Sequence, residues 1–235
     1  MLKVLDSAVP VACWSCSEAH NASVLFCPRC SKIQPVPTGD YFAVFGLEPK
    51  LNLDLAALEK EFHRLSRKLH PDRFARATEP EREWSLADTA LVNDAYRALK
   101  DPLQRTEYLL KQQGAEIGEE PSGKDRKDPS RAPADLLEEV FELNMQLEEM
   151  RMSRGAGESD PDLEKGLTAA RTKFLGLLDE VDRNLHEQWT AWDEGDETAR
   201  EAAQKEIAAL LDRRRYLSNL VREVNEALGN QALGV

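Results

Sequence analysis

Residues 55–72 read LAALEKEFHRLSRKLHPD, and this stretch predicts the fold around it. Its apolar residues recur at alternating steps of three and four, which places them on one face of an α-helix. They are Leu55, Leu58, Phe62, Leu65 and Leu69. Pro71 disfavours the helical conformation at His70 and has no backbone N–H, so the helix should end at or just before His70. His70 and Asp72 should therefore lie at an exposed helix tip.

The opposite face of the same helix is cationic, although the whole chain has a net charge of −12. Its basic residues are Lys60, Arg64, Arg67 and Lys68. A second helical pattern from Glu81 to Lys100 follows, and its predicted apolar face consists of Trp84, Leu91, Ala95 and Leu99. We therefore expect two antiparallel helices that are joined by an exposed loop.

Upstream of this hairpin, residues 40–47 read DYFAVFGL and predict a further short helix. The whole arrangement closely resembles the J-domain of DnaJ-type co-chaperones, in which an HPD loop activates a DnaK-type ATPase. The flanking pattern carries this resemblance, since a bare HPD tripeptide is a weak motif. The resemblance implies that His70, Pro71 and Asp72 contact the chaperone, with the basic face steering an acidic surface towards them. The alternative is an ordinary helical hairpin with a solvated basic face.

After the hairpin the chain continues as LQRTEYLL at residues 103–110, where many J-proteins have a Gly/Phe-rich tract. This segment resembles the HscB branch of the family, which serves iron–sulfur cluster biogenesis. The resemblance implies an all-α fold with a J-domain over 40–111 and a C-terminal three-helix bundle over 134–230. Between them, residues 112–133 are expected to form a flexible linker, because the stretch is polar, carries glycine, proline and scattered charge, and is longer than most ordered connections. It also implies a co-chaperone that performs no chemistry itself. Such a protein binds an IscU-type scaffold, delivers it to an HscA/DnaK-type chaperone and stimulates ATP hydrolysis for cluster transfer.

Residues 1–37 hold the four cysteines of the chain, in two CxxC pairs that are separated by ten residues. Cys13, Cys16, Cys27 and Cys30 could form a closed tetrahedral thiolate site, which suits structural zinc and leaves no open position for a substrate. Iron could also occupy four thiolates. The other possibilities are two disulfides, or a redox pair, which would need a βαβ setting that this segment lacks. His20 is surplus to a complete site and is expected to be a solvated loop residue.

The C-terminal third is predicted to be helical, and its first helix carries two adjacent apolar stripes. One is a core seam of Leu136, Val140, Leu143, Leu147 and Met150. The other contains Leu137, Phe141 and Met145, with acidic neighbours that include Glu142. The second stripe is either part of a wide core or a binding surface. The HscB resemblance implies a scaffold-binding patch of Leu137, Phe141 and Glu142, joined by Tyr216 from the last helix, whereas Met145 departs from the acidic residue usual in the family.

The remaining helices of the bundle have clear boundaries in the sequence. Asp160 and Pro161 should cap and open the second helix, which we expect to run to about Trp192, and Gly229 should end the third. The predicted core face of the second helix is Leu163, Leu167, Ala170, Phe174, Leu177, Val181 and Leu185. The third repeats apolar residues by heptads, at Ala203, Ile207, Leu210, Leu217, Val221, Val224 and Leu228.

The acidic composition argues against partners that are nucleic acids or anionic membranes, both of which need a basic surface. The chain shows no transmembrane run and no secretory signal, so we expect a bacterial cytoplasmic protein, or a mitochondrial matrix protein if a presequence has been removed. Two other functions stay open. They are a general J-protein that holds unfolded clients on the bundle, which the missing Gly/Phe tract disfavours, and a cysteine-based redox protein.

Overall fold

The computed structural model describes residues 10–35, 40–115, 133–157 and 159–229. The chain divides into two compact units, Met1–Gly114 and Ala115–Val235. The described residues are mainly helical, and their short strands lie in the cysteine-containing segment. Most of the predicted linker, residues 116–132, lies outside the described residues. No helix among the described residues is long and apolar enough to cross a membrane.

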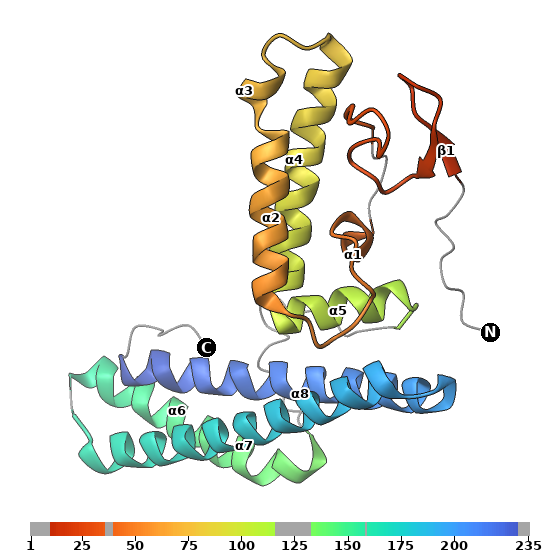
Figure 1. Ribbon diagram of the computed structural model, residues 1–235. Helices are drawn as coiled ribbons and strands as arrows, with labels where there is room; N and C mark the ends of the chain where they lie inside the picture. Colours follow the sequence, from red (N-terminus) through yellow and green to blue (C-terminus); the bar gives the residue numbers. More distant parts are fainter. Residues whose placement is uncertain (1–9, 36–39, 116–132, 158, 230–235) are drawn as a thin grey trace. The chain divides into compact units, whose positions relative to one another are not determined.

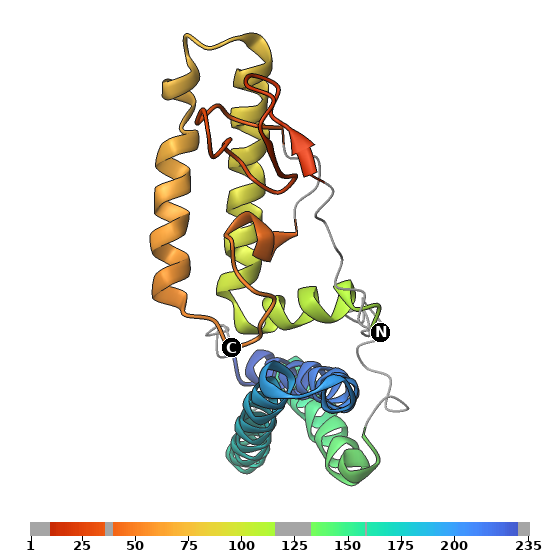
Figure 2. The same cartoon turned by 45° about the vertical axis from the view of Figure 1, so that its right-hand side comes forward.

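An antiparallel hairpin of α2 (Leu55–Leu69) and α4 (Glu79–Lys100) forms the centre of the first unit (Figure 1, Figure 2). The side chains that α2 and α4 bury between them include Leu58, Leu65, Leu69, Val92, Ala95 and Leu99. The predicted core face of α2 is confirmed at Leu58, Leu65 and Leu69. On α4, Trp84 and Leu91 were expected in the core but are only half-buried, because the buried stripe runs through Ser85 and Val92 instead. Leu55 was wrongly expected in this core and is exposed, because it is the first residue after the N-cap, Asp54.

The end of α2 lies where Pro71 predicts it. His70 leaves the helical conformation, with φ −53° and ψ 129°, and the chain re-enters a single-turn helix, α3 (Pro71–Phe74). The last carbonyl of α2, that of Leu69, accepts a hydrogen bond from the buried hydroxyl of Ser85 in α4 (2.7 Å). Thr89 donates to the same oxygen at 3.4 Å. A helix end that would otherwise leave a buried acceptor without a donor is thus satisfied from the partner helix.

Two further helices close the base of this hairpin, α1 (Tyr41–Val44) and α5 (Pro102–Gln112). Asp40 caps α1 and also accepts from the Tyr108 hydroxyl and the Gln112 amide of α5. Arg105 of α5 is only 5% exposed and donates to the carbonyls of Leu51 (2.8 Å) and Leu99 (2.5 Å). A buried arginine therefore ties the loop before α2 to the end of α4.

The described part of the tetracysteine module, residues 10–35, contains an antiparallel pair of strands, β1 (Pro10–Ala12) and β2 (Ala19–Asn21). It belongs to the same compact unit as the hairpin. Lys32 donates to Glu81 of α4 (2.9 Å), and the rings of Trp14 and Trp84 lie 5.7 Å apart. The module thus contacts the hairpin directly, although the sequence suggests only a linker between them.

The second unit is a bundle of α6 (Leu137–Ala156), α7 (Pro161–Glu194) and α8 (Glu197–Leu228), preceded by the short helix η3 (Ala134–Leu136). Asp160 caps α7, and Gly229 ends α8 with φ 72°, as predicted. Leu177 was expected in the core of α7, but it is half-buried and Leu178 is buried instead. The core continues through Trp189 and Trp192 near the end of α7. The expected three-helix bundle is confirmed.

Replacing Arg105 with methionine should lower the free energy of unfolding by about 3 kcal/mol or more, because two buried carbonyls would lose their donor. Arg97→Met is the matched control, since Arg97 is exposed and pairs only loosely with Asp94 (3.7 Å). It should cost less than about 0.5 kcal/mol. Denaturant unfolding of both variants measures the difference. Equal losses for the two would contradict the role given to Arg105.

Candidate functional site

The HPD tip, residues 70–72, lies outside the core of the first unit. The side chains of His70 and Asp72 are 59% and 89% exposed. His70 Nδ1 accepts from the backbone N–H of Asp72 (3.3 Å) and lies 3.5 Å from the Asp72 carboxylate. These local contacts fix the shape of the turn and leave most of both side chains accessible. The tip can therefore present an imidazole and a carboxylate to another protein.

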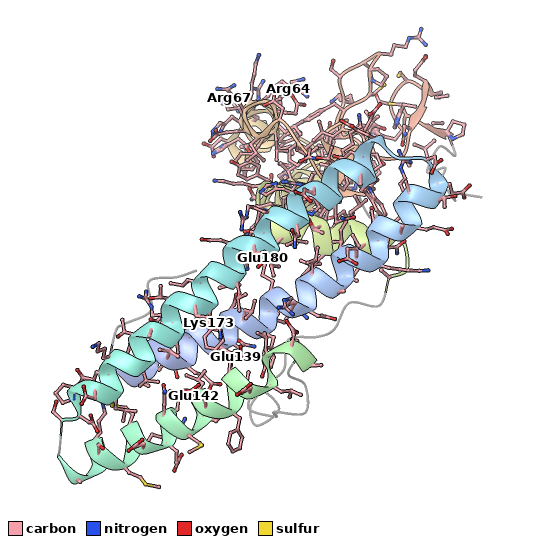
Figure 3. The ribbon with its side chains drawn as sticks, turned by 90° about the horizontal axis from the view of Figure 1, so that it is seen from below. Arg64, Arg67, Glu139, Glu142, Lys173 and Glu180 are labelled. Carbon is pink, nitrogen blue, oxygen red and sulfur yellow. The ribbon has the colours of Figure 1, made fainter. Side chains whose placement is uncertain are left out.

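The predicted basic face of α2 is solvent-exposed. Arg64 and Arg67 lie one turn apart on this helix (Figure 3). Arg64 forms a bidentate pair with Glu61 of the same helix, which raises the pKa of Arg64 and compensates its charge. Lys68 lies over the ring of Phe26. Within the described residues, Lys60 and Arg67 form no ion pair, so these two cations are the most available to an acidic partner.

The four cysteine sulfurs converge, all within 4.8 Å of one another. Cys13 Sγ lies 3.6 Å from Cys30 Sγ, and Cys16 Sγ lies 3.6 Å from Cys27 Sγ. Four sulfurs held at about 2.3 Å from a tetrahedral zinc ion would be about 3.8 Å apart, so the cluster has the dimensions of such a site. The structure therefore brings together the four residues that the CxxC spacing selects.

Both CxxC pairs adopt the same turn. The N–H of Ser17 donates to the carbonyl of Cys13 (2.9 Å), and the N–H of Ser31 donates to that of Cys27 (2.9 Å). Ser17 and Ser31 both have positive φ, 59° and 58°, a conformation that is uncommon outside glycine. Two strained serines at equivalent positions indicate that each turn is shaped to aim its sulfurs at one point.

Polar groups around the sulfurs support the binding of a cation. Ser15 N–H donates to Cys13 Sγ (3.3 Å), and the buried amide of Gln34 donates to the same sulfur (3.4 Å). Gln34 is held in turn by His20, whose Nε2 lies 3.2 Å from Gln34 Oε1. His20 is 8% exposed, so the expectation of a solvated loop residue is wrong. It orients a residue beside the sulfurs, as outer-shell groups of metal sites do.

The neighbouring thiols shift the pKa values of Cys13 and Cys16 in opposite directions. Burial raises the pKa of Cys13, but the N–H groups of Ser15 and Cys16 and the neighbouring thiols lower it by more, to about 6. The N–H of Glu18 lowers the pKa of Cys16, whereas burial and the other three thiols raise it to about 12. Four thiolates this close cannot all be charged without a compensating cation. The donor set therefore fits a thiophilic metal ion.

The second apolar stripe of α6 is exposed. Leu137, Phe141 and Met145 are 48%, 68% and 60% exposed, whereas the seam through Val140, Leu143 and Leu147 is buried. A wide core is thereby excluded. Glu142 lies on α6 next to Glu139, and Glu139 pairs with Lys173 of α7 (Figure 3). An apolar patch with an acidic neighbour is thus available to a partner.

Tyr216 of α8 is half-buried. Arg213, one turn earlier on α8, forms a bidentate ion pair with Asp135, just before α6 (2.7 and 3.0 Å). Residues three apart share a helix face, so Tyr216 lies on the side of α8 that faces this end of α6. That Tyr216 joins the patch on α6 stays a prediction.

Sequence reasoning missed several residues that support these sites. Gln34 and His20 hold the sulfur cluster, and Ser85 satisfies the end of α2 below the HPD tip. Glu81, which lies at the start of α4, was treated only as a helix boundary. It is buried, and hydrogen bonds from Lys32 and then Thr78 lower its pKa to about 2, although burial opposes this shift. The available signal was a Thr78-x-x-Glu81 capping box ahead of an apolar pattern.

The sequence of this chain is similar to those of known J-domain proteins. The profile of the DnaJ domain matches residues 40–108. The iron–sulfur cluster co-chaperone protein HscB of Mus musculus is 32% identical over 217 residues, which span 90% of this chain and 80% of the mouse protein. A co-chaperone protein HscB homolog from Shewanella sp. (strain ANA-3) is 36% identical over 139 residues, which span 59% of this chain and 76% of the homolog.

Solved structures agree with these relatives. Human co-chaperone protein HscB matches with a TM-score of 0.63 at 28% identity, covering 92% of this chain and 98% of the human chain. Chaperone HscB from Vibrio cholerae matches with a TM-score of 0.53 at 30% identity, covering 80% of this chain and 96% of the other. The predicted all-α fold, with a J-domain hairpin, a three-helix bundle and a small cysteine module, is thus confirmed. The chain belongs to the HscB family of J-domain co-chaperones.

Proposed function

We propose that this protein is an adaptor between an IscU-type iron–sulfur scaffold and an HscA/DnaK-type chaperone. The α6 patch binds the scaffold, and the HPD tip stimulates ATP hydrolysis by the chaperone, which drives cluster transfer. The observation that carries this proposal is the presence of two exposed sites in separate compact units: a J-domain tip in one and an apolar, acid-flanked patch in the other. A chain with two such sites can hold two proteins at once.

The proposed chaperone contact uses Lys60, Arg64, Arg67 and Lys68 for association and His70, Pro71 and Asp72 for activation. Cations on α2 attract an acidic surface and speed the encounter. Asp72, whose carboxylate is almost fully exposed, can then accept a hydrogen bond from an arginine of the chaperone, as the family resemblance implies. Because Glu61 already compensates Arg64, Lys60 and Arg67 carry most of the attraction.

The proposed scaffold contact centres on Phe141, the most exposed of the three apolar residues of its patch. Leu137 and Met145 flank it at steps of four on the same helix face, and Glu142 lies beside it. A large aromatic side chain among smaller apolar neighbours is a typical interface anchor. Tyr216 extends the contact onto α8. A folded scaffold, rather than any unfolded client, is the partner that this acid-flanked patch fits.

We propose that zinc is held by Cys13, Cys16, Cys27 and Cys30. Zinc suits four thiolates in a closed tetrahedral site, where its contribution is folding energy rather than chemistry. Gln34 and the N–H of Ser15 then offset part of the negative charge on Cys13. The compartment stays a prediction, a bacterial cytoplasm or a mitochondrial matrix, and the relatives come from both bacteria and animals.

Replacing His70 with glutamine should lower chaperone stimulation by about tenfold or more, because the imidazole is an exposed contact group. Melting temperature should stay unchanged, since the side chain lies outside the core. His63→Gln is the control, because His63 is an exposed histidine on α2 that pairs loosely with Glu59 (3.8 Å). Single-turnover ATP hydrolysis by the cognate chaperone is the assay. Stimulation within twofold of wild type for His70→Gln would refute the role of the tip.

Replacing Phe141 with alanine should weaken scaffold binding by about 2 kcal/mol, or roughly 30-fold in Kd. The melting temperature should change little, because the side chain is exposed. Met152→Ala is the control, an equally exposed residue on α6 two turns beyond Met145, and it should leave the affinity unchanged. Titration calorimetry against the IscU-type scaffold and a thermal melt test both variants. Unchanged affinity for Phe141→Ala would eliminate the patch.

Protein purified without added metal should contain about one zinc ion per chain by elemental analysis. Cys27→Ser should lose this zinc, whereas Ser15→Ala, a change within the first CxxC pair that removes no sulfur, should keep it. A visible iron–thiolate absorption, or the absence of zinc from the wild-type protein, would contradict the assignment.

A further inference from the structure

The tetracysteine module and the J-domain share one buried carboxylate. Glu81 Oε2 accepts from the backbone N–H (3.0 Å) and the hydroxyl (2.8 Å) of Thr78, and this closes the N-terminus of α4 as a capping box. Its other oxygen, Oε1, accepts from Lys32 of the module (2.9 Å). The Glu81 side chain is only 6% exposed. The first turn of α4 is therefore stabilised from inside the J-domain and from the module at the same time.

An aromatic contact between Trp14 and Trp84 also joins the module to α4. Trp14 lies inside the first CxxC pair, and its ring centroid is 5.7 Å from that of Trp84, on the second turn of α4. The indole N–H of Trp14 donates to the carbonyl of Ile33 (2.7 Å), which fixes the ring within the module. Lys32 follows the second CxxC pair. Each half of the cysteine cluster thus supplies one contact to the start of α4.

The module also reaches the end of α2. The ammonium group of Lys68 lies 5.4 Å from the centroid of the Phe26 ring. Phe26 precedes Cys27, and Lys68 lies two residues before His70. The module therefore contacts both helices of the hairpin close to the ends that the HPD tip connects.

We propose that the tetracysteine module braces the HPD tip, with Lys32 and Trp14 as positioning residues that keep the start of α4 folded. This inference rests on the proposed stimulation of a chaperone. Residues 70–78 connect the two braced ends, so fraying of the first turn of α4 would lengthen the flexible connection and disorder the tip. An ordered tip binds without a further entropic cost, whereas a frayed one must be ordered during the encounter. Metal that keeps the module folded would thus keep these contacts to α4 in place.

Four variants distinguish the loss of the contact between the module and α4 from a general loss of stability. Lys32→Met removes the charge and keeps the aliphatic stem, and Lys32→Arg restores the charge. Glu81→Gln keeps an acceptor for Thr78 but weakens the pairing with Lys32. Arg29→Met is the control, because Arg29 pairs with Glu18 inside the module (3.2 Å) and not with α4. Elemental analysis first shows that each variant retains the metal content of the wild type.

Hydrogen exchange of the amides of residues 79–85 in the full-length protein reports the brace directly. In the Lys32→Met variant these amides should exchange about fivefold faster than in the wild type. In Arg29→Met and Lys32→Arg they should exchange at the wild-type rate. The double variant Lys32→Met/Glu81→Gln should exchange little faster than the more affected single variant, because both substitutions remove the same Lys32–Glu81 ion pair. Unchanged exchange in Lys32→Met with metal retained would overturn the brace.

Chaperone stimulation tests the consequence. Lys32→Met should lower maximal stimulation about threefold and change the half-saturating concentration less, because the cations of α2 that drive association remain in place. Lys32→Arg should restore the wild-type value. Faster exchange without any loss of stimulation would overturn the positioning role. A wild-type protein that stimulates no chaperone would instead contradict the proposed function, while the exchange data would still decide whether the module braces α4.

Discussion

The hydrogen bond from Ser85 to the carbonyl of Leu69 is the contact on which the J-domain depends. Pro71 stops α2 and leaves its last carbonyl inside the protein without a helical donor. Ser85 supplies that donor from α4, so α2 can end abruptly beside its partner helix. His70 and Asp72 then project beyond the hairpin and take no part in its core. These two residues of the HPD tip are therefore not needed to build the hydrophobic core of the hairpin.

The distribution of charge follows the division of the chain into two units. The protein is acidic as a whole, yet α2 presents four cations, of which Arg64 is compensated by Glu61. The patch on α6 has acidic neighbours instead, so the two proposed partners meet surfaces of different character. Glu81 connects folding and recognition within the first unit, because one carboxylate closes α4 and receives Lys32 from the cysteine module.

Much of this structure could be predicted from periodicity and spacing. The steps of three and four in α2, the stop at Pro71, the cap at Asp160 and the two CxxC pairs all depend on local sequence, and the structure confirms them. The partners of buried polar groups could not be predicted, because Arg105, Ser85 and Lys32 bond to residues far away in the chain. In α7, Leu177 and Leu178 follow Phe174 by three and four residues, so periodicity places both near the core face, and only packing decides that Leu178 is the buried one. The second apolar stripe of α6 could not be assigned from the sequence, because periodicity does not tell whether another helix covers it; in the structure it is exposed.

The central claim is that one chain couples a scaffold to a chaperone through two separate sites. The most direct test is the rate of ATP hydrolysis by the cognate chaperone with the scaffold alone, with this protein alone and with both together. An adaptor should make the combined stimulation greater than the sum of the two separate stimulations, because it raises the local concentration of scaffold at the chaperone. A combined rate equal to that sum would contradict the account.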